Sequence, residues 1–210
     1  NGYIHSFEIV TGIDLKNKNE LTVNQTSYEL NKDFRPVSLS RSGQFEAQPF
    51  VFVGYGLKTL ATETLPEVND YAGLDVKNKW VVFFKDFPSQ VSKELRNHLI
   101  PFSSLAHKIT LAKNMGAYGV IAIDSPNLIN KDKITKMRFD GAPTSLPALE
   151  ISLKVFLDIM GLTEEQYDRL KASLEKNDHT EKIENRNTKI SAVVEFELKK
   201  KQARQVVGSI

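Results

Sequence analysis

The sequence contains no cysteine. This absence excludes a thiol nucleophile, an iron–sulfur cluster, a zinc site built on cysteines and a disulfide framework. An excess of charge of one sign is also lacking, because 28 Lys and Arg face 26 Asp and Glu and leave a net charge of +2. So balanced a charge gives no indication of binding to nucleic acid or to an anionic membrane surface, and we expect no nucleic-acid partner.

Long hydrophobic runs are absent as well. No apolar segment approaches the roughly 20 residues of a membrane-spanning helix, so no membrane span is expected. The sequence begins at Asn1 without a basic and then apolar opening, and we expect it to be a piece of a longer protein whose targeting segment lies outside it.

The common catalytic motifs are missing too. The sequence has no Gly-x-Ser-x-Gly elbow, no Walker phosphate loop and no His-Glu-x-x-His pair. None of its four histidines forms a His-x-Asp pair, and no two of them are four residues apart on one predicted helix. A catalytic zinc site needs three or more converging ligands, so we predict no catalytic residue, no metal ligand and no cofactor in this chain.

Regular structure is predicted most clearly in the middle of the chain. The apolar runs Trp80–Phe84 and Gly119–Ile123 are typical of strands that are buried on both faces. Between them, Ser104 is a suitable N-cap for a helix that ends at Gly116. Strand, helix and strand predict one right-handed βαβ unit with a parallel strand pair.

Strands are also predicted on either side of this unit. The N-terminal part contains β-forming segments at residues 3–10, 21–23 and 44–54, and Pro49 predicts an edge position or a break in the third. A strand over 146–151 leads to a helix between Ser152 and Gly161, and Thr163 with Gln166 forms a capping box for a second helix. The alternation of apolar and polar residues predicts a single strand over 189–199.

Residues 57–72 and 127–145 are predicted loops. Three aromatic residues are predicted to lie outside regular structure: Tyr55 in the glycine turn before the first loop, Tyr71 in that loop and Phe139 in the second. Exposed aromatic side chains serve as anchors in interfaces, so these three, with Arg138, are the candidate residues for contact with a substrate or partner. The alternative is that the rings pack against their own domain.

Three stretches together resemble a known family. They are Phe50-Val-Phe-Val-Gly-Tyr-Gly-Leu57, the segment from Asp70 to Val82, and Lys108-x-x-x-Ala112-x-x-x-Gly116-Ala-x-Gly-Val-Ile121. This series is similar to the protease-associated domain inserted in di-zinc aminopeptidases, in the wider family of glutamate carboxypeptidase and the transferrin receptor ectodomain. The resemblance continues through residues 146–152 and 189–199.

The resemblance implies a β-rich α+β fold, a sandwich-like or barrel-like body with flanking helices. It divides the chain into an N-terminal flank of short strands at 1–45, a protease-associated domain at 46–200 and the start of a catalytic domain at 201–210. In such enzymes the zinc ligands lie downstream of the inserted domain, so the resemblance implies zinc only there. The chain alone is then expected to hydrolyse nothing.

Three functions follow as hypotheses. The first is a non-catalytic accessory domain of a secreted, periplasmic or extracellular-facing zinc aminopeptidase, which contacts its own catalytic domain, shapes the access of peptides and takes part in dimer contacts. The second is a peptide-binding or protein-binding module of a receptor-like protein. The third is a complete metal-dependent hydrolase with a site that is not visible in the sequence.

Overall fold

The computed structural model describes residues 3–16, 18–126, 128, 145–175 and 187–207. Its strands are β1 (Tyr3–Leu15), β2 (Glu20–Val23), β3 (Thr26–Ser27), β4 (Phe34–Pro36), β5 (Gly43–Phe52), β6 (Trp80–Phe84), β7 (Gly119–Ile123), β8 (Ala148–Ile151), β9 (Lys189–Val194) and β10 (Phe196–Val207). Its helices are α1 (Lys93–Leu99), the short 3-10 helix η1 (Ile100–Phe102), α2 (Leu105–Asn114), α3 (Leu153–Met160) and α4 (Glu164–Glu175). None of these helices is long and apolar enough to cross a membrane.

The body of the molecule is built on one eight-stranded sheet in the order β3-β2-β9-β5-β6-β7-β8-β4. Strands β5, β6, β7 and β8 are parallel to one another, and the remaining pairs are antiparallel. The sheet curls into a half-barrel, so the predicted strand-rich α+β fold is confirmed, as is its central βαβ unit.

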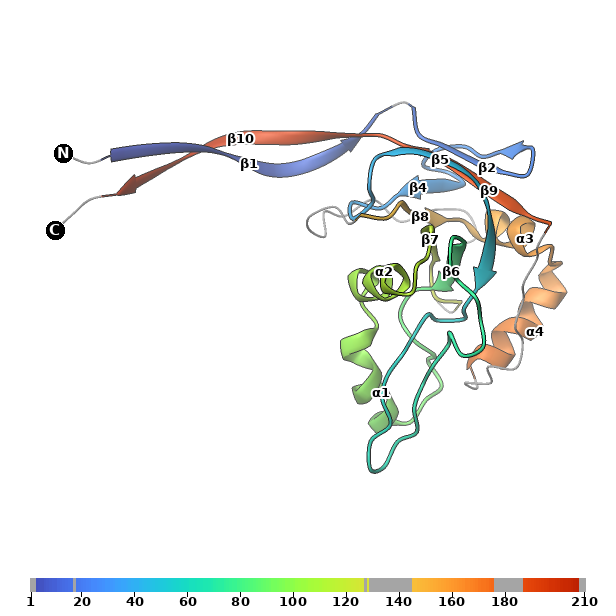
Figure 1. The fold of residues 1–210 in the computed structure, drawn as a ribbon. Helices are drawn as coiled ribbons and strands as arrows, with labels where there is room; N and C mark the ends of the chain where they lie inside the picture. The colour runs from blue at the N-terminus through green and yellow to red at the C-terminus, as the bar shows by residue number, and fades with distance from the viewer. Residues whose placement is uncertain (1–2, 17, 127, 129–144, 176–186, 208–210) are drawn as a thin grey trace.

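Helices cover the parallel part of the sheet from both sides, with α2 on one face and α3 and α4 on the other (Figure 1). Every residue of β6 and β7 is therefore buried. Ile109 and Ala112 of α2 pack with one set of alternate strand residues, and Val155 and Phe156 of α3 belong to the core cluster of the other set. The continuous apolar runs of the sequence thus have a direct structural cause.

Pro49 marks a change of partner along β5. The strand pairs with β9 as far as Pro49, which lies opposite Lys189, and with β6 from Phe50, which lies opposite Trp80. Because proline donates no backbone hydrogen bond, it is tolerated where one pairing ends and another begins. The strand itself runs unbroken from Gly43 to Phe52, so the predicted break is wrong and only the pairing partner changes at Pro49. The alternative of an edge strand is also wrong, since β5 lies between β9 and β6.

The helix ends follow the sequence signals. The Thr163 hydroxyl accepts a hydrogen bond from the Gln166 amide at 3.3 Å, and the Gln166 side chain accepts one from the Thr163 amide at 2.9 Å. The predicted capping box is therefore confirmed. Gly161 ends α3 with a φ of +66°, a backbone conformation that glycine adopts without strain.

The predicted single strand over 189–199 is wrong, because two strands meet there. β9 ends at Val194 inside the body, and β10 begins at Phe196 and leaves the body to pair with β1, from Leu15 opposite Phe196 to Tyr3 opposite Val207. We call this antiparallel β1–β10 pair the arm; Figure 1 shows it projecting from the body. The alternation of apolar and polar residues predicts that a strand forms, but it does not predict that the chain changes its pairing strand along the way.

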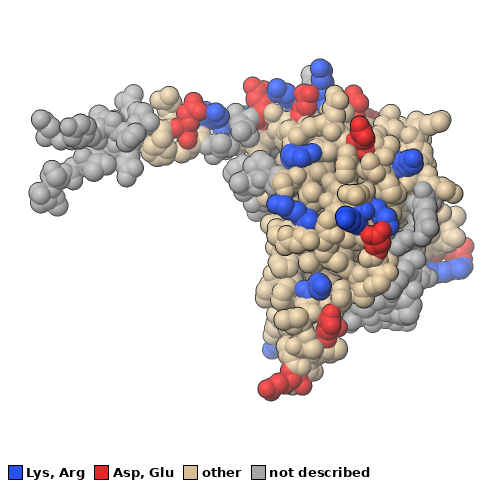
Figure 2. Space-filling model, in the orientation of Figure 1, with Lys and Arg blue, Asp and Glu red and all other residues tan. Residues whose placement is uncertain are grey.

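Charged side chains are interspersed on the face of the body shown in Figure 2. Lys and Arg lie among Asp and Glu, and neither sign gathers into a continuous patch on this face. This distribution on the face shown agrees with the balanced composition of the sequence.

Candidate functional site

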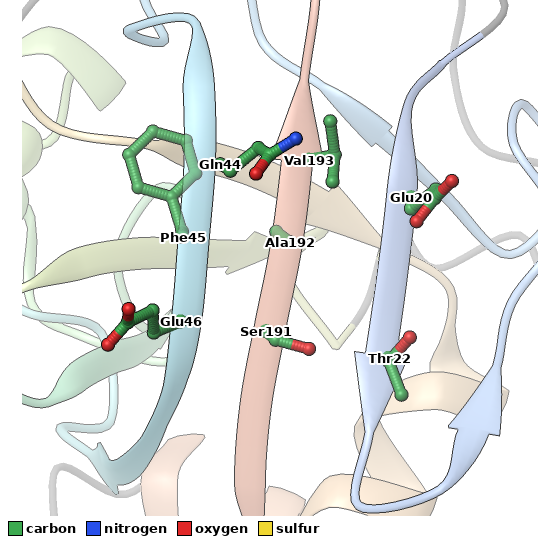
Figure 3. Close-up of a pocket in the computed structure, with 8 residues that line it drawn as sticks. All are labelled: Glu20, Thr22, Gln44, Phe45, Glu46, Ser191, Ala192 and Val193. Atoms are coloured by element: carbon green, nitrogen blue, oxygen red, sulfur yellow. The ribbon is translucent and has the colours of Figure 1, made fainter.

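The candidate site is an open groove of about 360 Å³ over the outer face of β2, β9 and β5, with eight lining residues. These are Glu20, Thr22, Gln44, Phe45, Glu46, Ser191, Ala192 and Val193. Figure 3 shows the three strands side by side, with the Gln44 side chain extending from β5 toward β9. We call this feature the sheet groove.

The alternation of the strands explains why most of these residues line a groove, whereas Phe45 and Ala192 are buried at its floor. Ile190, Ala192 and Val194 of β9 are buried in the body, which turns Ser191 and Val193 outward. On β2, Leu21 and Val23 are buried in the same way, and Glu20 and Thr22 face out. The pairing of β5 with β9 shifts register between Phe45 and Gln48, and such a bulge redirects the side chains next to it.

The sheet groove has an acidic character. Glu20 and Glu46 are exposed, and the lining contains no Lys, Arg or His. Its other polar groups are the Gln44 amide and the hydroxyls of Thr22 and Ser191. These groups can exchange hydrogen bonds with an extended peptide, and the two carboxylates favour a cationic one.

The groove lacks the parts of a hydrolytic site. Ser191 has no histidine among the lining residues to accept its proton, so the activated-nucleophile arrangement is not formed there. Among the residues that the structure describes, no three His, Asp or Glu side chains gather where they could hold a metal ion. The lining therefore offers hydrogen-bonding groups and two carboxylates for contact with a ligand.

Two of the four predicted contact residues lie inside the protein. Tyr55 and Tyr71 are each only 2% exposed, so the expectation that their rings are exposed anchors is wrong, and the alternative that they pack against their own domain holds. The Tyr55 hydroxyl donates to Glu175 Oε1 at 2.6 Å. The other two, Arg138 and Phe139, lie outside the described residues.

Burial also changes the acidity of these two tyrosines. It raises the pKa of Tyr55 above its usual range, and the hydrogen bond to Glu175 acts in the same direction. Burial raises the pKa of Tyr71 as well, with a smaller contribution from Asp70. Both phenols therefore stay protonated at neutral pH and act as structural groups of the core.

Sequence reasoning missed a buried cation beside Tyr55. Lys108 of α2 is fully buried, and its Nζ donates to the carbonyl oxygen of Phe84 at 3.0 Å and to that of Asp86. Burial lowers the pKa of Lys108 to about 7, although Asp70 and Asp86 counteract this effect. The available signal was the helical spacing, since Lys108 stands four residues before the buried Ala112 on the same face.

A second buried polar cluster joins four strands or strand ends. Arg35 of β4 donates through Nε to Glu150 of β8 at 2.6 Å, and Lys85 contacts both Glu150 and Asp124. Burial alone would lower the pKa of Lys85, but the two carboxylates outweigh burial and raise it. With two cations and two carboxylates the cluster is neutral, and we assign it a structural role.

Neither a protein-family model nor a curated protein sequence matches the chain. Among solved structures, an aminopeptidase from Aneurinibacillus sp. strain AM-1 is similar with a TM-score of 0.54 and 17% identity. A zinc aminopeptidase from Bacillus subtilis has a TM-score of 0.47 and 13% identity, over 96% of this chain and 35% of its own. The alignment with the Aneurinibacillus enzyme covers 98% of this chain but only 37% of that enzyme, and at this identity the similarity establishes a shared fold.

Proposed function

We propose that this chain is a non-catalytic accessory domain, of the protease-associated type, in a zinc-dependent aminopeptidase. The observation that carries the proposal is the fold match with the Aneurinibacillus aminopeptidase, because nearly all of this chain corresponds to about a third of that enzyme. A chain of 210 residues that corresponds to a minor part of a larger enzyme has the size of one domain within it.

The geometry of the arm supports attachment to another domain. The two ends of the described chain lie side by side at the tip of the arm, with Tyr3 opposite Val207. A domain whose ends are adjacent can be inserted into another domain without distorting it. Phe7 and Ile9 on β1 are 47% and 41% exposed, and these apolar side chains on a two-stranded ribbon favour contact with a further surface.

Zinc in this proposal belongs to the catalytic domain. The described residues of this chain do not fit a zinc site, because they offer no group of three ligands. The domain would act by its shape, limiting which peptides reach the catalytic centre, and the sheet groove would contact the peptide. On the same family resemblance we propose a secreted, periplasmic or extracellular-facing enzyme.

The test compares the 210-residue chain with the complete gene product. We expect the complete protein to contain zinc, to hydrolyse an aminoacyl 4-nitroanilide and to lose this activity to a chelator. The isolated chain should do none of these. Stoichiometric zinc and chelator-sensitive hydrolysis by the isolated chain would overturn the proposal, as would a complete protein without peptidase activity.

The sheet groove favours a second candidate function, a module that binds basic peptides. Its two exposed carboxylates, Glu20 and Glu46, have no cation among the lining residues. Titration of the chain with a lysine-rich heptapeptide and with its glutamate-rich counterpart tests this candidate. Saturable binding of only the basic peptide, lost in a Glu20→Gln/Glu46→Gln variant, would support it; equal binding of both peptides, or of neither, would exclude it.

A further inference from the structure

The arm joins the body through two short connections, one on each side, that are held together by one side chain. Glu195 lies between β9 and β10 and belongs to neither. The Asn19 side chain pairs with both backbone groups of Glu195: Oδ1 accepts from its N–H at 2.9 Å, and Nδ2 donates to its carbonyl oxygen at 3.0 Å. Nδ2 also donates to the Lys16 carbonyl oxygen at 2.6 Å. Asn19 is only 5% exposed.

The position of Asn19 explains why an amide is suited to this place. On the body side Glu20 lies opposite Val193, and on the arm side Leu15 lies opposite Phe196. Lys16 and Asn19 lie outside β1 and β2, and the N–H of Glu195 bonds to the Asn19 side chain instead of to the backbone of a facing strand. Only an amide side chain presents the acceptor and the two donor hydrogens that these three bonds use.

We call the connection between the arm and the body the joint, and it is narrow. On one side the chain passes from body to arm at Glu195, and on the other β1 ends at Leu15 and β2 begins at Glu20, with Lys16 and Asn19 next to these ends. No third strand of the described chain pairs with the arm, which would otherwise brace it against the body. The direction of the arm therefore depends on the hydrogen bonds at the joint, to which the Lys16 N–H adds one bond of 3.1 Å to the Glu195 carbonyl oxygen.

We propose that Asn19 is a latch that fixes the angle between the arm and the body. Because the next residue, Glu20, lines the sheet groove, the latch also sets the direction in which the groove faces relative to the arm. That consequence for an attached catalytic domain rests on the proposed function; the latch itself does not.

The absence of cysteine makes the arm angle directly measurable. Spin labels at Gln202→Cys on the exposed arm and at Asp168→Cys on the exposed side of α4 report the distance between arm and body by pulsed electron paramagnetic resonance. In Asn19→Ala, and in Asn19→Asp, which replaces the donor by a carboxylate oxygen and so places negative charge against two carbonyl oxygens, we expect a population of displaced arms about tenfold larger than in the unchanged chain, roughly the shift caused by losing a buried hydrogen bond.

Asn24 provides a matched control at the opposite end of the same strand pair. Its Oδ1 accepts from the Lys189 N–H at 2.9 Å, beyond the pairing of Val23 with Ile190. Asn24→Gly removes this bond, and glycine tolerates the φ of +55° at this position. The control should lose some stability and keep the narrow distance distribution.

The outcomes separate the latch from the proposed function. Distance distributions in folded Asn19 variants that match those of the unchanged chain would overturn the latch, and so would equal broadening in Asn24→Gly. In folded Asn19→Ala the Glu195 amide should also exchange its hydrogen faster, whereas the Val193 amide should not. If the distributions broaden but the same variants of the complete protein hydrolyse short and long peptides as before, the latch stands and the proposed control of access fails.

Discussion

The hydroxyl of Tyr55 and the carboxylate of Glu175 are joined by a hydrogen bond of 2.6 Å that connects the turn after β5 with the last residue of α4. Glu175 also accepts hydrogen bonds from the backbone N–H and the hydroxyl of Ser89, and it is only 2% exposed. Three donors on one buried carboxylate thus hold together segments that are far apart in the sequence. This arrangement makes Tyr55 a structural residue.

We predict that Tyr55→Phe lowers the free energy of unfolding by about 1–3 kcal/mol, because the buried carboxylate loses a charge-assisted hydrogen bond. Urea denaturation of the 210-residue chain measures the change. Tyr28→Phe is a matched control, since the Tyr28 hydroxyl donates to Asp158 at 2.9 Å but Asp158 is exposed and water can replace the donor. An equal or larger loss in Tyr28→Phe would contradict the role of burial.

Because the pKa of Lys108 is lowered in the fold, we predict that the stability of the protein depends on pH. Its pKa falls from 10.5 to about 7 on folding, so the unfolded chain binds more protons between these values. The contribution of Lys108 to the free energy of unfolding therefore rises with pH, by at most about 1.4 kcal/mol per pH unit. Below pH 7 both states are protonated and this contribution no longer changes.

The matching experiment compares Lys108→Met with Lys113→Met, an exposed position on the same helix. From pH 7 to 9.5 we expect the unchanged chain and the Lys113 variant to gain stability in parallel. The Lys108 variant should lack this part of the gain, because methionine has no proton to lose. Parallel curves for all three proteins would show that Lys108 has an ordinary pKa in the fold.

Glu150 is predicted to be the critical member of the buried ion cluster. Glu150→Gln leaves the Arg35 guanidinium, in a residue only 7% exposed, without a carboxylate, and we expect a loss of about 3–5 kcal/mol in the free energy of unfolding. Arg35→Met/Glu150→Leu should be more stable than Glu150→Gln, because it removes both buried charges while Asp124 still pairs with Lys85.

An exposed ion pair serves as the comparison for the loss of stability expected in Glu150→Gln. The side chains of Arg169 and Glu165 form an ion pair on α4 at 72% and 78% exposure, and Glu165→Gln should cost less than about 1 kcal/mol. A loss in Glu150→Gln as small as that in Glu165→Gln would mean that the cluster is hydrated rather than buried.

The sequence predicts best what depends on neighbouring residues. The strands Trp80–Phe84 and Gly119–Ile123 coincide with β6 and β7, and the caps at Ser104 and Thr163 are present, because burial on both faces and capping leave local patterns. Such patterns do not show which strands become neighbours. The change of partner at Glu195 and the arm were therefore not predictable from alternation alone.

The candidate site was less predictable than the fold, for a related reason. Tyr55 lies in a segment with loop composition, yet distant residues such as Glu175 and Lys108 enclose it. Most residues of the sheet groove point outward from three different strands, as Glu20, Gln44 and Ser191 do. These strands become neighbours only in the fold. An ordinary polar residue in an alternating strand gives no sign of which groove it will line.

Gly119 of β7 and Trp80 of β6 lie opposite each other and are closely packed. A Cβ added at Gly119 would lie 2.4 Å from Trp80 Cζ3 and 2.8 Å from Pro147 Cγ, distances at which one of the groups must move. Trp80 is fully buried, and its Nε1 donates to the Ile190 carbonyl oxygen at 2.8 Å, so the ring has no free direction. We expect Gly119→Ala to cost about 3 kcal/mol or more.

Gly161→Ala is the control that distinguishes this steric effect from the general cost of replacing a glycine with alanine. A Cβ added there would meet no atom within 4 Å, and only the φ of +66° opposes it, so Gly161→Ala should cost about 1–2 kcal/mol. Both free energies of unfolding come from urea denaturation of the 210-residue chain. If Gly119→Ala proved as stable as Gly161→Ala, β6 and β7 could not be packed as closely as the pairing of Trp80 with Gly119 requires.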